Sequence, residues 1–193
     1  MPCSRRSCKL LHKAQPKLRT TRLLLRPLQA SDVPEVQRIV ADPAVAKFAG
    51  NIIPCPCPDD WSRGWIAEQN NNFVDGESIC FAIIENHENV FLGTVRLEIY
   101  GSENRADLGY WLAQEQWGKG YATEAAMRMV QYAFHDLHLQ KITGGHVNSQ
   151  LDSGRVLQKI GMEPAGHTQQ KIHKNGAMLD VDLYQIFNPR LAD

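Results

Sequence analysis

Two glycines flank a lysine in the stretch 116-QWGKGYATEA-125, just before a segment rich in alanine. Glycine is a poor helix former, so Gly118 and Gly120 mark backbone that turns sharply or lets a ligand approach closely. The apolar pattern predicts a strand at 106–113 before this turn and a helix at 121–137 after it. The N–H groups at the start of a helix, together with the positive end of its dipole, favour phosphate or pyrophosphate binding.

Two common nucleotide motifs do not fit this turn. A Walker P-loop requires G-x-x-x-x-G-K-[ST], but Lys119 is followed by Gly120 and no earlier glycine has the required spacing. A dinucleotide fingerprint requires G-x-G-x-x-G, and counting from Gly118 the last place is Thr123. Taken alone, the two glycines fit either a ligand-binding turn or a tight connection between a strand and a helix.

The rest of the chain predicts a single α/β domain with a mixed sheet. Strands are expected at 20–28, 78–85, 90–100, 106–113, 140–147 and 178–187, the second and third forming a hairpin. Helices are expected at 32–42, 59–72, 121–137 and 152–162, with Asp42-Pro43 ending the first of them. Because side chains alternate along a strand, Glu98 points away from the face covered by its aliphatic neighbours.

The segments 106–134 and 153–162 resemble the GNAT acetyltransferase superfamily, and are most similar to the group that includes the ribosomal-protein N-terminal acetyltransferases. The similarity extends through 20–45 and 176–186. The resemblance implies one GNAT-like α/β domain at 19–193. The segment before it, 1–18, is basic and short of apolar residues, so a flexible leader is expected there. The central sheet of the domain would be mixed, largely antiparallel and twisted, flanked by helices, with a V-shaped splay between the two central strands.

The same resemblance implies an N-acetyltransferase that moves an acetyl group directly from acetyl-CoA to a primary amine, either a protein N-terminal α-amine or a small-molecule amine. In the pyrophosphate consensus of the family, Gly120 and Ala122 match the last two places and Trp117 stands in the first. The amides of 118–122 would hold the pyrophosphate, with charge added by Lys119 unless that lysine is simply solvated. The expected cofactor-binding residues are Tyr110, Trp111, Leu112, Trp117, Gly118, Lys119, Gly120, Tyr121, Ala122, Thr123, Asn148 and Ser153.

Acetyl transfer needs a base for the ammonium proton, donors for the developing oxyanion and an acid for the departing thiolate. Two carboxylates are candidates for the base. Glu98 lies on the strand that splays according to the resemblance, and Asp107 matches an acidic position in the similar group. The direction of the side chain favours Glu98. Each carboxylate also fits a solvated group paired with Arg96 or Arg105.

The acid is less well defined by the pattern. Many GNAT enzymes use a tyrosine at the position of Leu157, so that role does not carry over to this chain. The similar group has an Asn-x-x-Ser pattern near the thiol, in which Ser153 matches but Gln150 replaces the asparagine, with Asn148 as a substitute. Ser153, directly after Asp152, fits a helix N-cap equally well. These departures keep open the alternative of a non-catalytic CoA-binding sensor or scaffold.

Trp61 and Trp65 share one face of a predicted helix and are candidates for binding the acceptor, although such pairs more often belong to a core. No nucleophilic cysteine is required, and the Cys55-Pro-Cys57 spacing does not match common zinc sites, so no metal is expected.

Composition limits the remaining classes. The chain has 193 residues with 43% hydrophobic and 22% charged, which is ordinary for one globular domain. No apolar run approaches the roughly 20 residues of a membrane span, so a cytoplasmic protein is expected. Eight basic residues precede the first acidic one, Asp32, and the rest of the chain is acidic. The basic leader has no aromatic residue, which argues against nucleic-acid binding. Both a monomer and a homodimer are compatible with the sequence.

Overall fold

The computed structural model describes residues 14–48, 53–54, 57–147, 151–174 and 177–191. Within these residues, eight strands form one sheet in the order β1-β2-β3-β4-β5-β6-β8-β7. The strands are β1 (Leu18–Arg19), β2 (Leu23–Pro27), β3 (Ser78–Glu85), β4 (Phe91–Tyr100), β5 (Arg105–Leu112), β6 (Lys141–Val147), β7 (Glu163–Lys174) and β8 (Ala177–Phe187). The helices are α1 (Val33–Val40), α2 (Pro43–Phe48), α3 (Trp61–Asp75), α4 (Tyr121–His135) and α5 (Leu151–Lys159).

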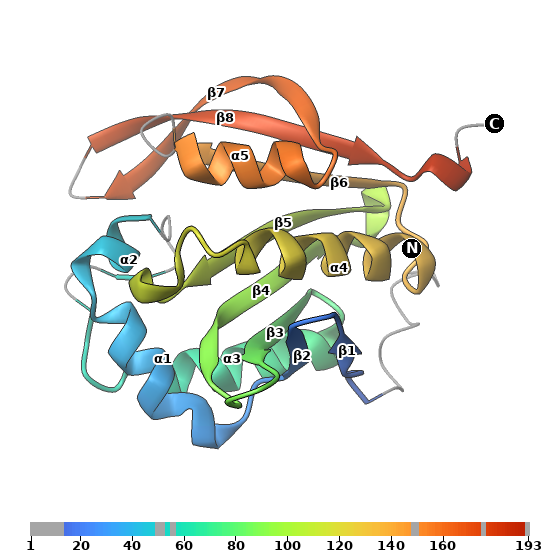
Figure 1. The fold of residues 1–193 in the computed structure, drawn as a ribbon. Helices are drawn as coiled ribbons and strands as arrows, with labels where there is room; N and C mark the ends of the chain where they lie inside the picture. The colour runs from blue at the N-terminus through green and yellow to red at the C-terminus, as the bar shows by residue number, and fades with distance from the viewer. Residues whose placement is uncertain (1–13, 49–52, 55–56, 148–150, 175–176, 192–193) are drawn as a thin grey trace, which may run out of the picture.

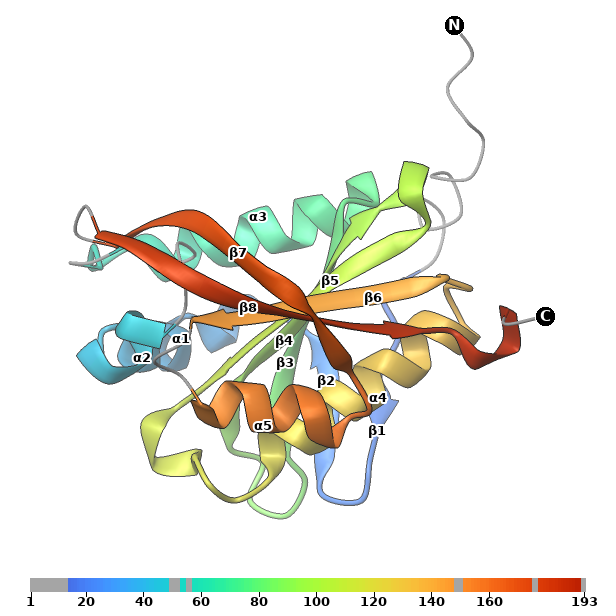
Figure 2. The same ribbon diagram turned by 90° about the horizontal axis from the view of Figure 1, so that it is seen from above.

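Helices cover both faces of the sheet, with α4 and α5 on one face and α1, α2 and α3 on the other (Figures 1 and 2). The alternation of side chains along the strands supplies an apolar layer to each face. Between the sheet and the helices α4 and α5, the core includes Leu23, Phe81, Val95, Leu97, Leu108 and Met129. Between the sheet and the helices α1 to α3, it includes Val36, Ile39, Trp65, Ala82, Ile84 and Trp111. The expected single α/β domain with a mixed, mostly antiparallel sheet is confirmed.

Two neighbouring strands separate along part of their length. β5 and β6 are parallel, and their ladder runs only from Arg105–Lys141 to Asp107–Thr143, although β5 continues to Leu112. By contrast, β4 pairs with β5 from Gly93–Leu112 to Tyr100–Arg105. The strand that carries Glu98 is therefore not at the splay, and this part of the prediction is wrong. The reason is topological: a short turn closes the β4–β5 hairpin, whereas the long crossover through α4 lets parallel β5 and β6 diverge.

Pro43 follows the end of α1, as expected, and it is also the first residue of α2, a helix that the sequence pattern did not predict. At this position the missing N–H of proline costs no helical hydrogen bond. The Asp42 carboxylate accepts a hydrogen bond of 2.8 Å from the backbone N–H of Ala44, in the manner of a helix cap. The predicted hairpin is confirmed as β3 and β4. Of the Cys-Pro segment, residues 51, 52, 55 and 56 lie outside the described part of the chain.

Candidate active site

The connection from β5 to α4 is a tight turn built around two glycines. The indole N–H of Trp117 donates to the carbonyl of Leu112 at 3.0 Å and so closes the connection back onto the end of β5. Gly118 has φ 74° and Gly120 has φ 81°, both in the left-handed region that side chains with a Cβ disfavour. The glycines predicted from the sequence to form a special turn do so.

The start of α4 fits a pyrophosphate. Gly120 is the N-cap residue, and no side chain of the described residues caps the helix there. The N–H groups of its first turn, from Tyr121 to Thr123, therefore lack intrahelical partners. A Cβ built at Gly118 would meet no atom within 4 Å, so the turn is open on that side. The Lys119 ammonium donates to Gln116 at 3.1 Å within the same connection. The turn thus leaves backbone donors open, with Lys119 paired to Gln116 beside them.

The end of β5 offers a second element for a donor molecule with amide groups. Residues 110–112 lie beyond the last β5–β6 pair, so their edge toward β6 is not part of a ladder. The Tyr110 hydroxyl donates to the carbonyl of Ser153 at 3.2 Å and thus bridges β5 to α5 across the splay. Burial raises the pKa of the Tyr110 phenol to about 12, so the group stays protonated and acts as a donor.

Ser153 is the third residue of α5, which begins at Leu151, so the interpretation of Ser153 as the N-cap is wrong. Ser153 is partly buried, and its backbone carbonyl is the group that meets the Tyr110 hydroxyl. Leu157, at the position where the family resemblance would place a tyrosine that acts as the acid, is 2% exposed and belongs to the core. Asn148 and Gln150 lie outside the described residues.

The two candidate bases, Glu98 and Asp107, face each other across the β4–β5 pair on the α3 side of the sheet. Glu98 points away from the aliphatic face of its strand, as predicted. Its two oxygens accept hydrogen bonds from Arg96 at 3.1 Å and from Tyr100 at 3.2 Å. Asp107 accepts from Arg105 at 2.9 Å and from the hydroxyl of Thr143, both through Oδ1. Among the described residues no group donates a hydrogen bond to its Oδ2. Asp107 is also the last residue of β5 that pairs with β6.

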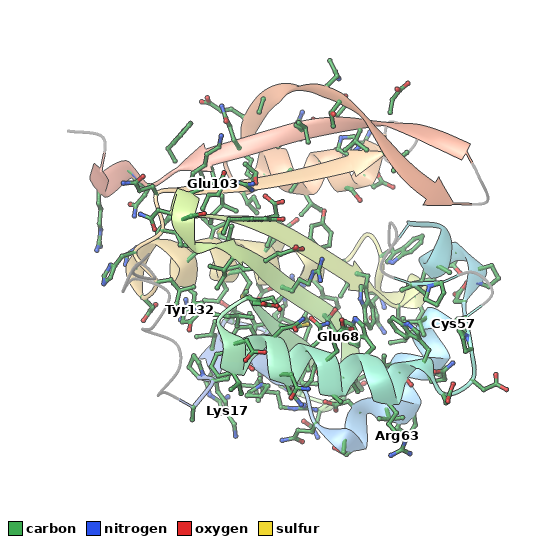
Figure 3. All side chains as sticks on the ribbon, turned by 180° about the vertical axis from the view of Figure 1, so that it is seen from behind. Lys17, Cys57, Arg63, Glu68, Glu103 and Tyr132 are labelled. Atoms are coloured by element: carbon green, nitrogen blue, oxygen red, sulfur yellow. The ribbon has the colours of Figure 1, made fainter. Side chains whose placement is uncertain are left out.

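Further contacts on this polar face show that its charges are closely coupled. The Arg105 guanidinium lies 3.9 Å from the centre of the Tyr100 ring. Burial first, then the charges of Asp107 and Glu98, raise the pKa of the Tyr100 phenol. Figure 3 shows the molecule from the side opposite to Figure 1, so that this face is toward the viewer, with α3 in front of the sheet and Glu103 at the tip of the β4–β5 hairpin.

Trp61 and Trp65 form a stacked pair whose ring centroids are 5.4 Å apart. Trp65 is 5% exposed and packs against Trp111 at 5.9 Å, so it belongs to the core between α3 and the sheet. Trp61 is only partly buried at the edge of the same cluster. The Trp111 ring points into this core, so only its backbone is placed to meet a donor molecule.

Other classes of site find little support in the described residues. No group of three or more His, Cys, Asp and Glu side chains there is placed to hold a metal ion. Burial raises the pKa of the Cys80 thiol to about 12, which leaves almost no thiolate at neutral pH. Within the same ranges, none of the helices has both the length and the apolar character needed to span a membrane.

One contact at the glycine turn was not predicted. Arg22, in the β1–β2 turn, binds both Glu124 in the first turn of α4 and the carbonyl of Lys119. Thr20 donates to the same Glu124 carboxylate at 2.6 Å. These partners are about a hundred residues apart in the sequence, and no local pattern connects them.

Comparison with known proteins agrees with this geometry. The family model of the acetyltransferase (GNAT) domain matches residues 22–163. The uncharacterized N-acetyltransferase p20 of Bacillus licheniformis is 28% identical over 176 residues, covering 91% of this chain and 98% of that protein. The probable N-acetyltransferase YjcK of Bacillus subtilis is 35% identical over 129 residues, covering 66% and 71%. The [ribosomal protein uS5]-alanine N-acetyltransferase of Escherichia coli is 24% identical over 134 residues, covering 67% and 69%.

Solved structures have the same fold. A GNAT-family acetyltransferase from Bacillus anthracis superposes with a TM-score of 0.78 at 25% identity, covering 90% of this chain and 99% of that one. RimJ from Mycobacterium smegmatis, solved in complex with CoA-disulfide, gives a TM-score of 0.79 at 20% identity, covering 92% and 88%. The chain therefore belongs to the GNAT family and is an N-acetyltransferase with acetyl-CoA as the acetyl donor.

Proposed function

We propose that this enzyme acetylates the α-amine at the N-terminus of a peptide or protein. One relative is named for a ribosomal-protein alanine substrate, which supports this class of acceptor. The polar face between α3 and the sheet supports it as well, because Glu98 and Asp107 give that face carboxylates that attract an ammonium group.

The observation that supports acetyl-CoA as the donor in this reaction is the placement of two elements at one end of β5. The uncapped start of α4, with left-handed Gly118 and Gly120, presents backbone N–H groups to a pyrophosphate. The edge of residues 110–112, freed by the splay, presents peptide groups to the amide-containing pantetheine arm. Acetyl-CoA supplies the acetyl group as a thioester at the far end of that arm.

The transfer forms a carbon–nitrogen bond, breaks the carbon–sulfur bond and releases a proton from the amine. We assign the removal of this proton to Asp107, directly or through one water. Asp107 lies where β5 and β6 begin to diverge and has Oδ2 available, whereas both oxygens of Glu98 are engaged. Tyr110 donates a hydrogen bond beside Ser153. The pKa of the Tyr110 phenol is about 12, whereas that of an ordinary thiol is about 8.5, so the phenol is too weak an acid to protonate the departing thiolate efficiently. We therefore assign Tyr110 to orienting the groups at the splay.

The test is a steady-state assay of thiol release from acetyl-CoA with peptides that begin with alanine or serine. The same peptides with a blocked N-terminus are the control, and a polyamine and an aminoglycoside represent small-molecule amines. Release with the free peptides alone supports the proposal. Release only with the small amines overturns the peptide assignment, and CoA binding without any turnover favours a non-catalytic sensor.

Two isosteric variants test the choice of base. Asp107→Asn should lower kcat by about 100-fold or more, as expected for loss of a general base, while CoA still binds. Glu98→Gln keeps the size of its side chain and should lower kcat much less. The opposite ranking would move the assignment to Glu98.

A further inference from the structure

Arg22 holds the glycine turn from outside the segment that forms it. Its Nε donates to Glu124 Oε2 at 2.7 Å, and its backbone N–H donates to Glu124 Oε1 at 2.8 Å. Its Nη1 donates to the carbonyl oxygen of Lys119 at 3.0 Å. The guanidinium also lies over the Tyr121 ring, 4.6 Å from its centre. A single side chain therefore contacts the last turn residues and the first helical turn together.

The bond to Lys119 fixes the direction of a peptide group. The carbonyl of Lys119 and the N–H of Gly120 belong to the same planar, trans peptide unit, so they point in opposite directions. With Arg22 bound to the carbonyl, the Gly120 N–H faces away from that guanidinium. Glycine tolerates many backbone conformations, and two glycines around Lys119 would otherwise let this peptide rotate.

Glu124 anchors the arginine in a defined position. The carboxylate is 18% exposed and accepts hydrogen bonds from the Thr20 hydroxyl and from Arg22. Burial alone would raise the pKa of Glu124, yet the hydrogen bonds from Thr20 and Arg22 bring the net shift below the ordinary value. Glu124 is therefore ionised at neutral pH and holds the fork of Arg22 from one side.

We propose that Arg22 is a positioning residue for the acetyl donor: it orients the Lys119–Gly120 peptide so that the turn meets the pyrophosphate in a preformed geometry. This inference rests on the proposed function of the turn. Its effect should appear in donor affinity more than in folding, because the Arg22 side chain is 44% exposed and exposed ion pairs add little stability.

The experiment compares two donors, acetyl-CoA and S-acetylpantetheine, which lacks the pyrophosphate. Arg22→Ala should raise KM for acetyl-CoA about tenfold, the effect of losing one hydrogen bond from a charged group, with kcat little changed. With S-acetylpantetheine, kcat/KM should equal that of the wild type. Arg38→Ala is the matched control, because Arg38 binds Glu115 in the same connection at 3.0 Å but, within the described part of the chain, donates to no carbonyl of the turn.

Two more variants separate positioning from simple attraction of phosphate by charge. Glu124→Gln removes a negative charge near the turn and also loosens the anchor of Arg22. Positioning predicts weaker acetyl-CoA binding in this variant, whereas attraction by charge predicts tighter binding. Arg22→Lys keeps the charge but cannot bond Glu124 and Lys119 in the same fork geometry, so positioning predicts that it resembles Arg22→Ala.

The outcomes also separate this inference from the proposed function. Wild-type protein that neither binds CoA in calorimetry nor releases thiol contradicts the function itself. If the wild type is active, equal behaviour of Arg22→Ala and Arg38→Ala overturns the inference alone. Equal losses with both donors in Arg22→Ala, or tighter binding in Glu124→Gln, overturn it too. Melting temperatures of all variants exclude unfolding as the cause.

Discussion

Gly93 and Gly109 lie in the paired strands β4 and β5, and replacing each with alanine should have opposite effects on stability. A Cβ at Gly93 would lie 2.1 Å from the carbonyl oxygen of Trp111 and 2.7 Å from the Cα of Leu112. Both are backbone atoms of β5, so they cannot move aside as a flexible side chain would. A Cβ at Gly109 would meet only the Arg96 side chain, at 3.7 Å or more, which is ordinary contact.

The magnitudes follow from these distances. Gly93→Ala must push β5 away from β4, and overpacking of this kind costs roughly 1–3 kcal/mol. Gly109→Ala should stabilise by roughly 0.5–1 kcal/mol, because glycine inside a strand is worse than alanine by that amount. For a chain of this length, 1 kcal/mol shifts Tm by about 2–4 °C. The expected changes are a Tm lowered by about 2–12 °C for Gly93→Ala and raised by about 1–4 °C for Gly109→Ala.

The assay is thermal unfolding of both variants beside the wild type, followed by KM for acetyl-CoA. Displacement of Trp111 and Leu112 should raise this KM in Gly93→Ala, because both residues lie on the freed end of β5. A Gly93→Ala variant as stable as the wild type would refute the close approach of the two strands. A Gly109→Ala variant less stable than the wild type would refute the inference that a Cβ fits at this position without a clash.

Three further changes test single groups. Tyr110→Phe removes the bond to Ser153 and should lower stability by roughly 0.5–1.5 kcal/mol, measured by urea unfolding; no loss would mean that the bond is absent. Burial raises the pKa of Cys80 to about 12, so this thiol should not react with a disulfide reagent at pH 8 in the native protein. Cys80→Ser should therefore leave the number of reactive thiols unchanged. A lower number in the variant would show that Cys80 is accessible. The folded-state pKa of Glu124 is lowered from 4.5, so its contribution to stability is complete above that pH and is lost as pH falls through the lowered pKa. The Tm difference between the wild type and Glu124→Gln should therefore shrink below pH 4.5. A constant Tm difference would contradict this.

Much of the fold could be predicted because its determinants are local. The alternation of Val95 and Leu97 with polar neighbours identified β4, and the turn residues before it identified the hairpin with β3. Gly118 and Gly120 identified the turn before α4, since only a special backbone conformation explains two glycines there. Helix α2 was not predicted, because the proline that ends one helix is equally suited to begin the next.

The candidate site could be predicted only as far as it depends on such local features. Side-chain alternation placed Glu98 on a polar position and the family resemblance singled out Asp107. Neither says where two strands that are distant in the sequence stop pairing. That limit is set by the β5–β6 register, which depends on how the crossover through α4 packs, and it favours Asp107. Arg22 and Glu124 show the same limit, because each has an ordinary local environment in the sequence. Arg22 and Glu124 pair only when the first strands lie beside α4. The geometry of the glycine turn therefore depends on Arg22, a residue outside the glycine motif itself.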